Sequence, residues 1–135
     1  MRIILIFIAL TGCVHAGQSV KVFDSTLSLD SQCELVSEID GKINNYNMGF
    51  KEPKNCRIIT HQNTSAENIV FINGGYIAFI ENNHDDLSTC YSEYTAIKIS
   101  KDNDITISPL IKKSGSCFQG KEIKDFEYFS SKFRH

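Results

Sequence analysis

Residues 68–80, Asn-Ile-Val-Phe-Ile-Asn-Gly-Gly-Tyr-Ile-Ala-Phe-Ile, constrain the fold most strongly. Two runs of β-branched and aromatic residues flank Asn73-Gly74-Gly75, where glycine can adopt positive φ angles, so the pattern predicts a β-hairpin. With Gly74-Gly75 as the turn pair, Ile72 would pair with Ile77. Because side chains alternate between faces along a strand, both faces of this hairpin would be apolar. We therefore expect a central hairpin in a sheet that is covered on both sides.

The first 16 residues have the features of an export signal. Met1-Arg2 precedes an uncharged apolar run from Ile3 to Leu10, and small residues surround Val14-His15-Ala16. This arrangement is typical of a secretory signal peptide. The apolar run is shorter than the ~20 residues that a membrane-spanning helix needs. Residues 17–135 then have the length of one domain.

A second interpretation of the same segment is lipidation. Leu10-Thr11-Gly12-Cys13 resembles the bacterial lipobox, and this resemblance implies that Cys13 is acylated and becomes the new N-terminus. Cleavage after Ala16 would instead release a soluble protein. The sequence leaves both alternatives open, so we expect either a periplasmic or outer-membrane lipoprotein or a secreted protein. Contact with a membrane is expected only through this lipid.

Four further cysteines predict two disulfides in an oxidising compartment. Their spacings of 23, 34 and 27 residues include no close Cys-x-x-Cys pair, which argues against a structural zinc site. A turn centred on Asn103 would place Cys90 opposite residue 116, and a bulge near Pro109 would bring Cys117 into register. We therefore expect the pairs Cys33–Cys56 and Cys90–Cys117.

The charge of the chain argues against nucleic-acid binding. The 14 Lys and Arg residues become 13 when Arg2 is removed with the signal, against 16 Asp and Glu, which gives a net charge of −3. A nucleic-acid-binding protein normally carries a basic face. Neither a phosphate-binding loop nor a metalloprotease motif is present in the sequence. We expect no cofactor and no metal.

The segment 31–45 carries a helical pattern. Ser31 and Glu34 have the spacing of a capping box, in which a Ser side chain and a Glu three residues later satisfy the first backbone amides. One apolar stripe follows, formed by Leu35, Val36, Ile39 and Ile43. The pattern predicts a helix over residues 31–45.

Further strands are predicted near Val20–Phe23 and over residues 56–60, 91–99 and 105–108. Residues 81–86 are expected to form a charged loop. Phe126, Phe129 and Phe133 predict a short C-terminal helix, with a last strand as the alternative. The expected fold class is α+β, with one N-terminal helix packed on an antiparallel sheet of about five or six strands.

Candidate functional residues are few. His84, Asp85 and Asp86 form the one close cluster of histidine and carboxylates, and with His61 they could support a secreted hydrolase or a metal-dependent enzyme. Tyr76, Tyr91 and Tyr94 could instead line a recognition face, because tyrosine offers a large rigid surface with a polar tip.

The sequence favours a small exported, disulfide-stabilised, non-enzymatic binding protein of the cell envelope or exterior. Its expected partner is a protein or a second copy of the chain. An inhibitor or immunity-type protein that acts on a lytic enzyme is the narrower hypothesis, which rests on size and compartment. The alternatives are the hydrolase or metal-dependent enzyme and a structural envelope lipoprotein.

Overall fold

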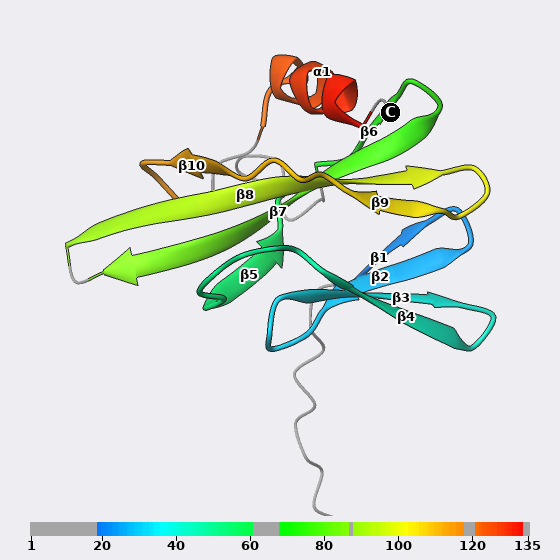
Figure 1. The fold of residues 1–135 in the computed structure, drawn as a ribbon, viewed down its shortest axis with the longest axis horizontal. Coiled ribbons are helices and arrows are strands. Elements are labelled where there is room, and N and C mark those ends of the chain that lie inside the picture. Colours follow the sequence, from blue (N-terminus) through cyan, green and yellow to red (C-terminus); the bar gives the residue numbers. More distant parts are fainter. Residues whose placement is uncertain (1–18, 61–67, 87, 118–120, 134–135) are drawn as a thin grey trace, which may run out of the picture.

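The computed structural model describes residues 19–60, 68–86, 88–117 and 121–133. These residues form a four-stranded antiparallel sheet, a six-stranded antiparallel sheet and one helix, stacked as three layers with the larger sheet in the middle (Figure 1). The expected fold class, an N-terminal helix on a single sheet, is therefore wrong. The described helix lies near the C-terminus, and the residues assigned to the N-terminal helix form strands of a second sheet.

The four-stranded sheet is a meander with the strand order β1-β2-β3-β4. Its strands are β1 (Ser19–Val22), β2 (Ser25–Leu29), β3 (Glu34–Ile39) and β4 (Lys42–Asn47). The helix predicted over residues 31–45 is replaced by the β3–β4 hairpin.

A two-residue turn explains this correction. Asp40 and Gly41 have φ angles of 49° and 77°, which is the type I′ geometry that Asp-Gly favours between antiparallel strands. Leu35 and Ser37 alternate into the interior and are buried, as a period of two requires. The expected cap at Ser31 is absent, because the Asp30 carboxylate accepts hydrogen bonds from the nearby backbone amides instead.

The six-stranded sheet is built on a long hairpin of β7 (Gly75–Asp86) and β8 (Thr89–Ser100). Two shorter strands pair with β7, namely β5 (Asn55–Ile58) and β6 (Val70–Ile72). Two others pair with β8, namely β9 (Ile105–Ile107) and β10 (Lys112–Ser114). The free end of the hairpin extends beyond both covering layers (Figure 1).

The β6–β7 hairpin forms with a different turn pair from the predicted one. Asn73 and Gly74, with φ angles of 50° and 82°, occupy the turn, so Ile72 pairs with Gly75 rather than with Ile77. Gly75 is buried, and a Cβ atom there would lie 2.9 Å from the carbonyl oxygen of Ile99. A shift of two residues preserves the face of every side chain, so the strand is still covered on both sides.

The loop predicted over residues 81–86 is also wrong. β7 continues to Asp86, which pairs with Thr89, and the residues from Glu81 to His84 are all buried. β8 is equally long, so its backbone supplies hydrogen bonds to the whole polar segment. Because the side chains in this part of the central strand are polar, the hydrophobicity pattern of the sequence did not indicate a strand.

Both disulfides have the expected pairs, with Cα–Cα distances of 5.4 Å for Cys33–Cys56 and 5.6 Å for Cys90–Cys117. The first links the two sheets, and the second closes the end of the long hairpin against the segment after β10. A turn centred on Asn103 would pair Ile99 with Ile107, but Ile97 pairs with Ile107, a difference of two residues. Beyond Pro109, Lys112 pairs with Tyr94, which is the register of that turn without the one-residue bulge expected near Pro109.

The core has two parts, one on each face of the six-stranded sheet. One part lies between the sheets and includes Leu27, Leu35 and Ile97. The other lies beneath α1 (Ile123–Lys132), where Phe79 contacts the rings of Phe126 and Phe129 at centroid distances of 4.7 and 5.1 Å. The predicted C-terminal helix is thus confirmed. Among the described residues, no helix combines the length and apolar character needed to cross a membrane.

Candidate functional site

The three tyrosines of the predicted recognition face lie in separate environments. Tyr76 is half-buried near the start of β7, whereas Tyr91 is 42 % exposed at the opposite end of the hairpin. Tyr94 is buried in the core beneath the helix. The three side chains do not form one surface. The lipidation candidate Cys13, the signal segment 1–16 and His61 lie outside the described residues.

Tyr76 belongs to a groove at the seam between the two sheets. This groove has a volume of 250 Å³, and its lining residues are Lys21, Val22, Phe23, Ile69 and Tyr76. Phe71 pairs directly with Tyr76 across β6 and β7 and extends the same apolar surface, with a ring-centroid distance of 5.1 Å. We call Phe23, Ile69, Phe71 and Tyr76 the aromatic groove.

Phe23 occupies an unfavourable backbone conformation in this groove. Its φ angle is 53°, in the left-handed region that costs a residue with a side chain roughly 1–2 kcal/mol. The residue lies in the β1–β2 turn, and its ring contacts Tyr76 at a centroid distance of 5.1 Å. Glycine, asparagine or aspartate would satisfy such a turn without this cost. Strain of this kind is concentrated at functional positions in proteins.

Phe71 remains exposed beside the groove. Its side chain is 48 % exposed, although it contacts Tyr76, and the Nζ atom of Lys101 lies 5.9 Å from its ring centroid. Exposed aromatic side chains next to a rigid apolar depression are the features that dominate binding energy at protein interfaces. Sequence reasoning identified Tyr76 but missed Phe23 and Phe71. The sequence signal available for Phe23 was an aromatic residue next to Asp24, at a position where a turn follows a strand.

The second unusual region is the polar end of β7. Strand alternation directs Glu81 and Asn83 toward the helix layer and Asn82 and His84 toward the opposite side of the sheet. Asp85 consequently lies on the face opposite to His84, so the predicted cluster of His84, Asp85 and Asp86 does not converge on one site. Within the described ranges, no group of three or more His, Cys, Asp or Glu residues is arranged to hold a metal ion.

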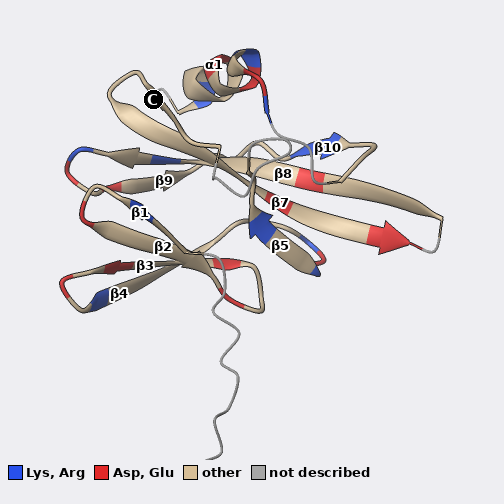
Figure 2. Cartoon of the chain, turned by 180° about the vertical axis from the view of Figure 1, so that it is seen from behind, with Lys and Arg blue, Asp and Glu red and all other residues tan. Residues whose placement is uncertain are grey.

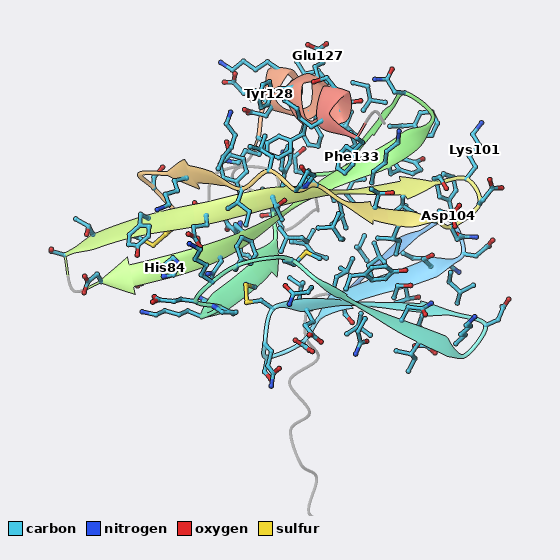
Figure 3. All side chains as sticks on the ribbon, in the orientation of Figure 1. His84, Lys101, Asp104, Glu127, Tyr128 and Phe133 are labelled. Carbon is cyan, nitrogen blue, oxygen red and sulfur yellow. A yellow bond between two sulfur atoms is a disulfide. The ribbon has the colours of Figure 1, made fainter. Side chains whose placement is uncertain are left out.

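His84 lines a small depression at this polar end. The depression has a volume of 210 Å³, and its lining residues are Lys51, Glu52, His84, Tyr91, Glu93 and Lys113. The imidazole is buried and stacks on the Tyr91 ring, with a centroid distance of 4.7 Å and an interplanar angle of 9°. The residue lies near the free end of the long hairpin (Figure 3).

Asn82 determines which nitrogen of His84 carries the proton. The Oδ1 atom of Asn82 accepts hydrogen bonds from the backbone amides of Lys54 and Asn55 at 3.0 and 3.3 Å. Its Nδ2 atom donates to the carbonyl oxygen of Glu52 at 2.9 Å and lies 3.1 Å from the Nε2 atom of His84. Because Nδ2 can only donate, the Nε2 atom of neutral His84 must accept, and the ring proton is therefore on Nδ1.

We expect the substitution His84→Phe to weaken the attachment of residues 52–55. Phenylalanine keeps an aromatic ring against Tyr91 but offers no acceptor to the Nδ2 atom of Asn82. Loss of one hydrogen bond worth about 1 kcal/mol corresponds to a roughly fivefold lower amide protection. Hydrogen exchange at Lys54 and Asn55, measured as protection factors, tests this expectation.

The variant Tyr91→Phe provides the matched control, because it retains the ring stacked on His84 and leaves the contact between Asn82 and His84 in place. Its protection factors at Lys54 and Asn55 should equal those of the wild type. Nitrogen-15 chemical shifts that assign the neutral proton of His84 to Nε2 would show that the proposed orientation of the hydrogen bond is incorrect.

The helix-facing side of the polar end contains a buried ion pair. The Glu81 side chain is 2 % exposed, its Oε1 atom accepts from the Nε atom of Arg57, and Asn83 donates to the same oxygen at 3.2 Å. A buried carboxylate requires such partners, since removal from water disfavours its charge. This arrangement fixes β5 against β7.

Tyr94 and Lys121 form a cation–π contact close to this ion pair. The Nζ atom of Lys121 lies 3.8 Å from the Tyr94 ring centroid. Burial lowers the pKa of Lys121, although attraction by Asp125 and Glu81 opposes the shift. Burial raises the pKa of Tyr94, and the charge of Asp125 adds to this effect. Because the pKa of Lys121 is lowered in the folded protein, its contribution to the free energy of unfolding rises as the pH increases toward about 10. Because the pKa of Tyr94 is raised, its contribution falls above about pH 10.

No protein family, curated protein or solved structure matches the chain. The geometry therefore carries the functional interpretation. Two disulfides are typical of proteins from an oxidising environment. The aromatic groove presents an apolar surface suited to binding. At the polar end, Glu81 and Asn82 are hydrogen-bonded, whereas the Oδ1 atom of Asn83 and the Nδ1 atom of His84 are buried without a hydrogen-bond partner among the described residues.

Proposed function

We propose that this chain is an exported, non-enzymatic binding protein of the cell envelope or exterior that engages a protein partner through the aromatic groove. The observation that carries the proposal is the strained Phe23, which is held against Tyr76 while the neighbouring Phe71 remains half-exposed. Folding alone would favour a smaller turn residue and a buried Phe71. A partner that contacts the rings of Phe23 and Phe71 would account for this arrangement.

The architecture around the groove supports this role. The groove combines the β1–β2 turn of one sheet with β6 and β7 of the other, and Cys33–Cys56 links the same two sheets covalently. A preformed site loses little conformational entropy when it binds. The disulfide between the two sheets therefore holds the aromatic side chains of the groove in a fixed arrangement.

Affinity capture from an envelope extract of the native host tests the proposal. The wild-type chain should retain a partner that Phe71→Ser fails to retain, because a partner packed on Phe71 loses an apolar contact. Ile43→Ser is the matched control, since Ile43 on β4 is 61 % exposed and lies outside the groove. Equal retention by both variants would place the interaction elsewhere and contradict the proposal.

The narrower role, inhibition of a lytic enzyme, belongs to the same proposal. If the captured partner is such an enzyme, Phe71→Ser should restore its activity in the presence of the chain, whereas Ile43→Ser should not. A second copy of the chain as the partner would appear as a dimer of wild-type protein that Phe71→Ser dissociates.

Intact mass of the protein from its host tests the export component. A mass that begins at acylated Cys13 identifies a lipoprotein, and one that begins at Gly17 identifies a secreted protein. Either mass, with two disulfides formed, agrees with export. A chain that retains Met1 and reduced cysteines would contradict it.

A further inference from the structure

We infer that the aromatic groove binds a protein segment in which a large apolar side chain is flanked by Asp or Glu. This inference rests on the proposed function and specifies the chemistry of the partner. It follows from the size of the groove, from its apolar lining and from the distribution of charges around it.

The size of the groove fits a side chain rather than an enclosed small molecule. Its volume of 250 Å³ is below the ~300–1,000 Å³ typical of pockets that enclose drug-sized ligands. Phe23, Ile69 and Tyr76 supply an apolar wall, and Phe71 is exposed at its border. One aromatic or aliphatic anchor from a partner would be buried against this wall. The remaining contacts would lie at the rim.

The charged residues at the groove are basic. Lys21 lines the groove, and Lys101 reaches the ring of Phe71. Within the described part of the chain, neither lysine forms an ion pair with an Asp or Glu side chain. Both ammonium groups are therefore available to a carboxylate that arrives with the partner. Figure 2 shows that basic and acidic residues are otherwise spread over both sheets.

None of the described residues that line the groove is acidic. Asp102 and Asp104 line a separate depression together with Asp40, and Lys101 and Asp104 extend to different sides of the β8–β9 turn (Figure 3). The Asp24 carboxylate accepts a hydrogen bond from the Nδ2 atom of Asn103 at 3.4 Å. Asp40, Asp102 and Asp104 thus line the other depression together with Lys42, whereas Lys21 is the charged residue among the described residues that line the groove.

The two lysines at the groove would discriminate between partners. An acidic flank would be attracted to Lys21 and Lys101, whereas a basic flank would be repelled at the same positions. Apolar burial would supply the affinity, and the lysines would supply the selectivity.

Three synthetic peptides test the inference, each with a central Phe-Leu pair flanked by two Glu residues, two Gln residues or two Lys residues on each side. Titration into nitrogen-15-labelled protein reports both the affinity and the location of binding. We expect the Glu peptide to shift the resonances of Phe23, Phe71 and Tyr76 and to bind at least tenfold more tightly than the Lys peptide. The preference should decrease with added salt.

Charge reversal provides the stricter test. Lys21→Glu combined with Lys101→Glu should invert the order of the Glu and Lys peptides. Lys42→Glu combined with Lys54→Glu makes the same change in net charge at exposed positions outside the groove and should leave the order unchanged. An unchanged order in the first variant would overturn the inference.

The outcomes also separate this inference from the proposed function. Equal binding of all three peptides at the groove would overturn the acidic preference while leaving a protein-binding groove. Absence of binding by the Glu peptide, with a native partner that still depends on Phe71, would likewise overturn the inference alone. A native partner that is indifferent to Phe71 would overturn both.

Discussion

Replacing Arg57 with methionine is expected to lower the free energy of unfolding by about 3 kcal/mol, because the substitution leaves the Glu81 carboxylate buried without its cation. The Arg57 side chain is 27 % exposed, whereas that of Glu81 is 2 % exposed. The effect should therefore lie at the lower end of the range known for broken buried ion pairs, roughly 3–5 kcal/mol. Urea unfolding, with a slope that matches the wild-type slope, measures this difference.

The double variant Arg57→Met with Glu81→Leu is the control for this prediction. It removes both charges, so most of the lost stability should return. Asn83 would then lose its acceptor on Glu81, which sets a limit to the recovery. If the single and double variants are equally unstable, the loss arises from packing of the Arg57 side chain rather than from an unpaired charge.

Removal of the disulfide between the sheets should have an effect of similar size. The variant Cys33→Ala with Cys56→Ala opens a loop with a sequence separation of 23 residues, for which chain entropy predicts a loss of about 3 kcal/mol. Cys90–Cys117 has a sequence separation of 27 residues, so chain entropy predicts that its removal lowers the free energy of unfolding by nearly the same amount. Thermal or urea unfolding of the two double variants provides the comparison.

Partner binding should distinguish the two disulfides. Cys33–Cys56 connects the sheets whose seam forms the aromatic groove, whereas Cys90–Cys117 closes the opposite end of the long hairpin. We expect only the first double variant to bind the captured partner more weakly when both variants are folded. Equal weakening would show that the groove does not depend on the connection between the sheets.

The sequence predicted the features that local chemistry determines. The apolar runs around Asn73 indicated the β6–β7 hairpin, and the spacing of Cys90 and Cys117 around a turn indicated their disulfide. Phe126 and Phe129 correctly indicated a C-terminal helix. In the structure, the hairpin residues pair across β6 and β7, Cys90 forms a disulfide with Cys117, and Phe126 and Phe129 are buried.

The errors arose where two periodicities compete or where polar residues are buried. Leu35 and Ile39 fit a helical stripe, but the Asp40-Gly41 turn, a strong hairpin signal, determines the structure of this segment. The segment from Glu81 to His84 resembles a loop in composition, but its partners include the Glu52 carbonyl and the Arg57 side chain, which are 30 and 24 residues away from Asn82 and Glu81. Tertiary pairing of this kind cannot be read from local sequence.

The candidate site was predicted only in part for the same reason. Tyr76 was identified as a binding residue, but its neighbour Phe23 is 53 positions away in the sequence and comes from the other sheet. Phe71 was assigned correctly to a strand, yet its exposure depends on what the surrounding layers leave uncovered. A groove at a seam between sheets appears only when both sheets are in place.

The dissociation constant of the captured partner for wild-type, Phe71→Ser and Ile43→Ser protein tests the central claim most directly. Loss of an anchor residue costs about 2 kcal/mol or more, so Phe71→Ser should weaken binding by roughly 30-fold, whereas Ile43→Ser should bind like the wild type. All three proteins should have similar unfolding curves, because both side chains are exposed. Equal dissociation constants for the two variants would contradict a function at the aromatic groove.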